Sequence, residues 1–214
     1  DPIEENGGDN LYGFVHNRPI SVFDILGREP VNEGVVVLIP DDTVGYDKVE
    51  ASLVTHVNLN KQKNNWIVIP VESINDANQL LKNNKDCKCI KELNIIGHGS
   101  SGVQNLVSVN DFNVKKRGYG RLWAEWDSGA KKWNVTGLEV FKDVKFCKPC
   151  EVYLRGCSVG QGAAGKTLVN AIKKATGCKT YAWSSPTTEI TPYKGLPGSG
   201  FIGIKAGPDI VSDE

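Results

Sequence analysis

Hydrophobic residues in the middle of the chain fall into five short runs, separated by polar and turn-forming residues. The runs are GVVVLIP (34–40), WIVIPV (66–71), ELNIIG (92–97), EVYLRG (151–156) and KTYAWS (179–184). Short runs of nearly continuous hydrophobicity are typical of strands that are buried on both faces of a parallel sheet. We therefore expect five such strands.

Helical patterns separate several of these runs. They cover residues 46–57, 73–84 and 163–177. In the first and third, apolar residues recur three and four positions apart, as in a helix with one buried face. Ser73 is placed to cap the second helix, and Gly177 is placed to end the third. Alternating strands and helices predict one α/β domain over residues 31–214, with a mainly parallel sheet flanked by helices.

Residues 100–150 and the C-terminal tail depart from this alternation. The stretch RLWAEWDSGAKKWNVT (121–136) predicts a β-hairpin that turns at 127–129. We expect this insertion to lie near the functional site, with its tryptophans holding the hairpin against the body rather than forming a platform for carbohydrate or nucleotide. In the tail, residues 185–200 predict a loop and GSGFIGIKAG (198–207) predicts an edge strand.

Composition excludes some partners. The 214 residues include 25 basic and 25 acidic side chains, so the formal net charge is zero. This balance gives no general attraction to nucleic acid or to an anionic membrane. No apolar run approaches the roughly 20 residues of a membrane helix. Because the chain also lacks a signal peptide and any methionine, we expect it to be a piece of a longer protein.

The first thirty residues have a different character, rich in Gly, Asn, Asp and Pro. Their pattern resembles the closing segment of the Rhs/YD-repeat core. The matching residues are Asp1-Pro2-Ile3, Gly7-Gly8, Asn10-Leu11-Tyr12, Asn17, Pro19, Asp24 and Gly27. The segment DILGR, Asp24 to Arg28, replaces the usual Asp-Pro-x-Gly-Leu, which leaves self-cleavage at this junction open. A plain linker is the alternative interpretation.

The Rhs resemblance implies a division of the chain at about residue 30. Residues 1–30 would end the repeat core, and residues 31–214 would be the variable C-terminal domain, the position where these proteins carry toxins enclosed by a repeat shell. The expected partners are this shell and an immunity protein. The expected location is secreted or delivered into a target cell.

The segment GQGAAGKT (160–167) matches the phosphate-binding pattern G-x-x-x-x-G-K-[ST]. In phosphate-loop folds this loop follows the first strand, and a carboxylate at the end of another strand helps to hold Mg²⁺. Here only 47 residues follow Thr167, and no later strand ends in an acidic residue. A nucleotide-dependent enzyme is therefore the less favoured alternative, with Lys166 on the surface.

A histidine and a cysteine close two of the predicted strands. His98 follows the run at 92–97, and Cys157 follows the run at 151–156. Reactive groups of parallel sheets gather at the carboxyl ends of the strands. If the two strands are neighbours, the imidazole is placed to take the thiol proton, and the backbone N–H groups of Gly99 and Cys157 are placed to bind an oxyanion. A structural histidine and a buried, unreactive cysteine are the alternatives.

These two motifs, LNIIGHGSSG (93–102) and VYLRGCSVG (152–160), resemble those of caspase-like (clan CD) cysteine peptidases. The resemblance implies a three-layer sandwich, a peptide or protein substrate and no cofactor. It makes His98 the general base and Cys157 the nucleophile. A third, orienting group often lies at the end of the first strand in these families, where Asp41 or Asp42 stands. A catalytically silent binding module on the same fold is the first alternative.

The resemblance also suggests a substrate preference. In these families the residue two positions before the nucleophile lines the specificity pocket, and here it is Arg155. Arginine at this place implies an acidic side chain before the scissile bond. Two alternatives remain: Arg155 pairs with a structural carboxylate, or Glu189 pairs with it or favours a basic substrate residue instead.

The five other cysteines precede the third, fourth and fifth strands, so they are expected at the amino end of the sheet, away from Cys157. They are Cys87, Cys89, Cys147, Cys150 and Cys178. The C-x-C and C-x-x-C pairs (87/89 and 147/150) would suit a four-cysteine zinc site. The same proximity would allow two disulfides in an exported protein, and disulfides or free thiols are favoured over zinc.

Overall fold

The structure is a computed structural model of the chain. It describes residues 31–42, 46, 48–108, 120–184, 190–193, 201–204 and 210–211. The first thirty residues, which carry the Rhs-like pattern, lie outside the described residues, and so does Glu189. The predicted boundary at residue 30 is therefore not tested.

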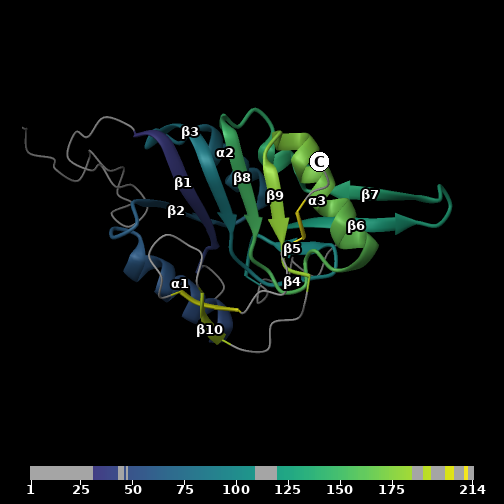
Figure 1. The fold of residues 1–214 in the computed structure, drawn as a ribbon, viewed down its shortest axis with the longest axis horizontal. Coiled ribbons are helices and arrows are strands. Elements are labelled where there is room, and N and C mark those ends of the chain that lie inside the picture. The colour runs from purple at the N-terminus through teal and green to yellow at the C-terminus, as the bar shows by residue number, and fades with distance from the viewer. Residues whose placement is uncertain are drawn as a thin grey trace, which may run out of the picture.

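The centre of the fold is a six-stranded sheet with the order β12-β9-β8-β3-β1-β2 (Figure 1). Five strands run parallel, as predicted from the apolar runs, and the short β12 pairs antiparallel with β9. Their bounds are β1 Val31–Pro40, β2 Trp66–Val71, β3 Cys87–Ile95, β8 Phe146–Leu154, β9 Lys179–Ala182 and β12 Ile210–Val211. The predicted α/β class with a mainly parallel sheet is confirmed.

Three helices pack on the two faces of this sheet: α1 Lys48–Asn60, α2 Ile74–Lys82 and α3 Gly162–Thr176. The predicted caps are confirmed. The Ser73 hydroxyl accepts a hydrogen bond from the Asp76 amide, and Gly177 ends α3 in the left-handed conformation, with its amide donating to the Lys173 carbonyl. In Figure 1, α3 lies beside β9 at the right-hand end of the sheet, and α1 lies below the other end.

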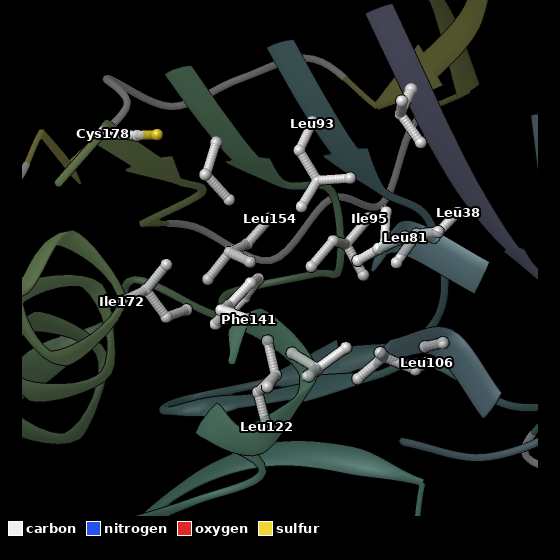
Figure 2. Close-up of a cluster of buried hydrophobic side chains, with 14 of the residues drawn as sticks. Leu38, Leu81, Leu93, Ile95, Leu106, Leu122, Phe141, Leu154, Ile172 and Cys178 are labelled. Atoms are coloured by element: carbon white, nitrogen blue, oxygen red, sulfur yellow. The ribbon is translucent and has the colours of Figure 1, made fainter. Parts of the chain in front are cut away.

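The period-2 alternation of the strands separates two apolar clusters. Val36 and Leu38 of β1 point into the larger cluster with the buried residues of α2 and α3, including Ile172 (Figure 2). Val37 and Ile39 point to the opposite face, where they meet the apolar side of α1. Because both faces of β1 are apolar, its sequence is a continuous apolar run.

A second, four-stranded antiparallel sheet lies at the carboxyl ends of the parallel strands (Figure 1). It consists of β4 Gly99–Ser100, β5 Val103–Asn105, β6 Arg121–Asp127 and β7 Lys132–Thr136. The predicted hairpin is confirmed, and its turn is held by Asp127, whose Oδ1 accepts from the amides of Gly129 and Ala130. A short 3-10 helix, η3 (Leu138–Phe141), leads from β7 to β8. The hairpin projects from the body of the molecule in Figure 1.

The tail differs from the prediction. β11 (Phe201–Ile204), from the stretch expected to form an edge strand, pairs with β10 (Ile190–Tyr193) in a separate two-stranded ribbon. The edge of the main sheet is β12, which follows that stretch. Both tail strands are short and contain β-branched residues, so local pattern alone does not select their partners.

The five cysteines at the amino end of the sheet do lie together, and four of them form disulfides. Cys89 pairs with Cys147, and Cys150 pairs with Cys178. These bonds join β3 to β8 and β8 to the start of β9. Cys87 is buried and lies outside both bonds. The predicted cluster of Cys87, Cys89, Cys147 and Cys150 is therefore wrong in one residue, since Cys178 takes part in place of Cys87. Among the described residues, no group of three metal-ligating side chains is present. None of the described helices is long and apolar enough to cross a membrane.

Candidate active site

The strand register places His98 and Cys157 at corresponding positions on neighbouring strands. β3 and β8 are adjacent and parallel, with Ile95 opposite Leu154. Each candidate residue lies three positions beyond its member of that pair. The backbone continues the pairing past the strand ends, since the Arg155 amide donates to the Ile95 carbonyl over 2.9 Å. The two motifs therefore leave the sheet together at its carboxyl edge.

The two glycines beside these residues are in direct backbone contact. A Cβ atom added to Gly99 would lie 2.9 Å from both Cα and C of Gly156, and one added to Gly156 would lie 2.9 Å from Cα and N of Gly99. Such distances exclude a side chain at either position without movement of the backbone. Glycine is therefore required here for the close approach of two backbone segments. This contact brings the backbone at His98 next to that at Cys157.

A buried glutamine ties the two motifs together. Gln104, which is 0% exposed, accepts from the Gly156 amide through Oε1 (2.8 Å) and donates from Nε2 to the Asn105 carbonyl (2.9 Å). The Asn105 amide in turn donates to the His98 carbonyl over 2.8 Å. One side chain thus fixes the loop before Cys157 against the strand that follows His98, and it satisfies a backbone group that burial would otherwise leave unpaired.

The backbone conformation at both motifs bears on the predicted oxyanion site. His98 and Asn105 form a hydrogen-bonded antiparallel pair, so the next pair, Gly99 and Gln104, is non-hydrogen-bonded. The Gly99 N–H therefore points away from β5. After Cys157 the chain turns sharply, with Ser158 at φ 55°, a left-handed conformation that is uncommon for a residue with a side chain. The roles of the Gly99 and Cys157 amides in binding an oxyanion stay predictions.

Acidic residues lie at the carboxyl end of β1 and in the first turn of α1. Asp41 follows Leu38, the partner of Ile95, by three positions, so it shares the register of His98 on the other side of β3. Its backbone amide donates to the Val71 carbonyl, whereas Asp42 is exposed. Burial and the nearby charges of Asp42, Asp41 and Glu50 raise the pKa of Tyr46 to about 12. Register therefore favours Asp41 over Asp42 as the orienting group.

Glu50 is a buried carboxylate that the sequence pattern did not reveal. It lies in the first turn of α1, is 1% exposed and accepts a 2.6 Å hydrogen bond from the hydroxyl of Ser108. Ser108 follows β5 by three residues and is also buried. An acidic residue in a first helical turn usually faces solvent, so its burial depends on the course of residues 106–108 and was not visible in the local sequence.

Arg155 is enclosed by the sheet face rather than open to solvent. It is 8% exposed, its Nε donates to Asn94 Oδ1 over 3.0 Å, and its guanidinium lies 4.3 Å from the centre of the Tyr153 ring. The Asn94 amide donates in turn to Glu92. The acceptor of the Nε–H is thus an amide, and a carboxylate lies one step beyond it. These contacts are typical of an arginine with a structural role rather than of one that lines a specificity pocket.

The GQGAAGKT segment forms the start of α3 but is closed against the protein. The amides of Gly160, Gln161 and Gly165 donate to the carbonyls of Trp183, Ser158 and Gln161, respectively. A Cβ atom on Gly165 would lie 2.1 Å from the carbonyl carbon of Gly160, so helix and loop touch. A phosphate loop needs outward-facing amides, and most of this loop's glycines serve packing instead. The structure thus disfavours nucleotide binding.

Comparison with protein-family models, with curated proteins and with solved structures gives no match. The site is therefore interpreted from its own geometry.

Proposed function

We propose that this chain is a cysteine endopeptidase in which His98 and Cys157 form the catalytic dyad. The observation that carries the proposal is the shared position of the two residues, three beyond a paired position on adjacent parallel strands, with the glycines next to them in contact. A structural histidine and a core cysteine would not need two glycines and a buried glutamine to bring their backbones together.

The proposed mechanism follows from these positions. The His98 imidazole takes the proton of the Cys157 thiol, and the thiolate attacks the carbonyl carbon of the substrate. The resulting oxyanion accepts from the N–H of Gly99 and from that of Cys157. The protonated imidazole then gives its proton to the leaving amine, and water hydrolyses the thioester. Asp41 is the proposed group that orients the imidazole. No cofactor takes part in these steps.

The finer identity of the fold and its biological setting belong to the same proposal. The sheet with helices on both faces supports a caspase-like three-layer arrangement. The Rhs-like N-terminal pattern supports a domain carried as a toxin or self-processing device and delivered into a target cell. Its partners would then be a protein substrate, the repeat shell and an immunity protein.

The test compares the wild type with Cys157→Ala and His98→Ala, using Cys87→Ala as the matched cysteine control. New peptide N-termini are counted by mass spectrometry after incubation with a denatured protein mixture, and toxicity on expression is scored in parallel. Loss of cleavage in the two dyad variants, with cleavage kept in Cys87→Ala, supports the peptidase. Equal cleavage by wild type and Cys157→Ala contradicts it.

Labelling with iodoacetamide separates the peptidase from a silent binding module on the same fold. A nucleophile activated by His98 is alkylated rapidly at neutral pH, and His98→Ala slows this alkylation. A thiol that reacts no faster than an unfolded cysteine, with or without His98, supports the binding module.

A further inference from the structure

Ser158, the residue after Cys157, has a backbone conformation that is unusual for a buried side chain. Four described residues other than glycine have positive φ: Asn65 (53°), Lys131 (49°), Asp143 (59°) and Ser158 (55°). The first three are exposed, whereas Ser158 is only 8% exposed. Asparagine and aspartate adopt this left-handed conformation more readily than most residues, and glycine adopts it without steric cost. Within the described part of the chain, Ser158 is therefore the one non-glycine residue that is both left-handed and buried.

Backbone hydrogen bonds hold the loop that contains Ser158. Its carbonyl accepts from the Gln161 amide over 2.9 Å. The carbonyl of the next residue, Val159, accepts from the Gly102 amide over 2.9 Å. Neither bond involves the Ser158 side chain, so glycine would serve the same loop with less strain. A serine at this position therefore points to a role for its hydroxyl.

The Ser158 hydroxyl makes no hydrogen bond with any described residue, and its oxygen is not sealed from solvent. Most buried polar side chains in folded proteins have a partner. Residues held in sparsely populated backbone conformations are concentrated at functional sites. A left-handed serine with an unpaired, accessible hydroxyl beside the candidate nucleophile thus has the properties of a group that meets its partner when a substrate binds.

We propose that the Ser158 hydroxyl donates a hydrogen bond to the oxyanion that forms when the Cys157 thiolate attacks a carbonyl carbon. Consecutive Cα atoms are about 3.8 Å apart, so the two side chains leave the loop from adjacent points. Oxyanion donors are most effective when they are held in place before the reaction, as the loop's bonds to Gln161 and Gly102 hold this one. The role rests on the proposed function, and it adds a side-chain donor to the backbone N–H groups predicted from the sequence.

Two reagents separate this role from a general effect on the thiol. In acylation by p-nitrophenyl acetate, the Cys157 thiolate attacks the carbonyl carbon, negative charge collects on the carbonyl oxygen, and the bond to p-nitrophenolate then breaks. Iodoacetamide alkylates the same sulfur by direct displacement of iodide, so no oxyanion forms. A donor to the oxyanion therefore changes the acylation rate and leaves the alkylation rate as it is.

The test compares the two rates in the wild type, Ser158→Gly and Ser158→Ala. Both variants should be acylated about tenfold or more slowly than the wild type, as loss of an oxyanion donor implies, and alkylated at the wild-type rate. Release of p-nitrophenolate measures acylation, and the rate left in Cys157→Ala is subtracted. Lys131→Gly is the matched control, because it removes a left-handed side chain from an exposed turn, and both of its rates should equal those of the wild type.

The urea midpoint shows whether Ser158 has a structural role instead. Ser158→Gly should unfold close to the wild-type midpoint, because relief of strain offsets the greater freedom of glycine in the unfolded chain. A large fall in the midpoint together with slower alkylation would assign Ser158 to packing and overturn the proposal. Rapid acylation of the wild type that Ser158→Gly leaves unchanged overturns the role of Ser158 alone. A wild type acylated no faster than an unfolded cysteine overturns the peptidase and this role together.

Discussion

At the level of single residues, the candidate site depends on two glycines, because neither has a side chain. Gly99 and Gly156 let two backbones touch beside the candidate dyad. Glycine next to a strand-terminal histidine or cysteine was visible in the sequence, and so these positions were predicted. What the sequence did not show is that each glycine is required because of the other.

We expect Gly156→Ala to slow alkylation of Cys157 and to lower the free energy of unfolding. The new Cβ would lie 2.8 Å from Gln104 Oε1 and 2.9 Å from the Gly99 backbone, and overpacking of this kind costs about 1–3 kcal/mol. Urea denaturation and iodoacetamide kinetics measure the two effects. Gly129→Ala is the control, because its Cβ has only the Asp127 carboxylate at 3.4 Å. Equal behaviour of the two variants would contradict the packing argument.

Gln104→Met should destabilise the loop that carries Cys157. The substitution keeps the length of the side chain but leaves the buried Gly156 amide without an acceptor, a loss of about 1–3 kcal/mol. Amide hydrogen exchange at Gly156 should accelerate, and cleavage should fall with it. If exchange at this amide stays as slow as in the wild type, Gln104 is not what holds the loop.

Cys87 and Cys157 should differ in reactivity. Burial raises the pKa of the Cys87 thiol, so less of it is thiolate at any given pH. Iodoacetamide at neutral pH is expected to modify Cys157 first, with Cys87 following only at alkaline pH or after unfolding. Peptide mapping of the singly alkylated protein measures the order. Modification of Cys87 first would show that the carboxyl edge of the sheet does not activate its thiol.

At the level of elements, the five parallel strands were predictable because each is an apolar run, and the helices because their caps and spacing are local. The register that aligns His98 with Cys157 was not, since it depends on which strands are neighbours. The strands of the tail were assigned to the wrong partner for the same reason.

The two disulfides should stabilise the fold without tuning the site. They close loops with sequence separations of 58 and 28 residues, for which chain entropy gives about 4 and about 3.5 kcal/mol. Replacing both cysteines of either pair by serine should lower the free energy of unfolding by about 2–4 kcal/mol in urea titrations. The alkylation rate of Cys157 in native buffer should stay the same, because the bonds lie at the opposite edge of the sheet. A parallel fall in that rate would show coupling between the edges.

At the level of the whole molecule, the core is divided unequally by the sheet. Among the side chains that the structure describes, the larger cluster joins the sheet to α2, α3 and the small antiparallel sheet, whereas the smaller one consists mainly of residues of α1 and of the strands under it. Regions with few buried contacts open with lower free energy than the centre of the core. This asymmetry was not predictable from hydrophobicity, because α1 and α3 both have an apolar face.

Hydrogen exchange should therefore distinguish the two faces. We expect amides of α1 to exchange faster than those of α3 under native conditions, as measured by mass spectrometry of peptides from residues 48–60 and 162–176. The amides of α2, which Ser73 caps, provide an internal reference on the slower face. Equal protection of α1 and α3 would mean that the molecule opens only as one unit.

The distribution of cysteines along β8 also bears on how the protein has to be made. Cys147 and Cys150 lie at the beginning of this strand, and Cys157 lies beyond its end. In the folded chain, roughly 13 Å of strand separates Cys150 from Leu154, so the Cys157 sulfur is kept away from the disulfides. Before the sheet forms, nothing enforces that separation, and the Cys157 thiol competes for Cys89 and Cys178. Native cysteine pairing thus depends on sheet assembly before oxidation. Refolding under slow thiol–disulfide exchange should therefore recover more native protein than refolding under rapid air oxidation.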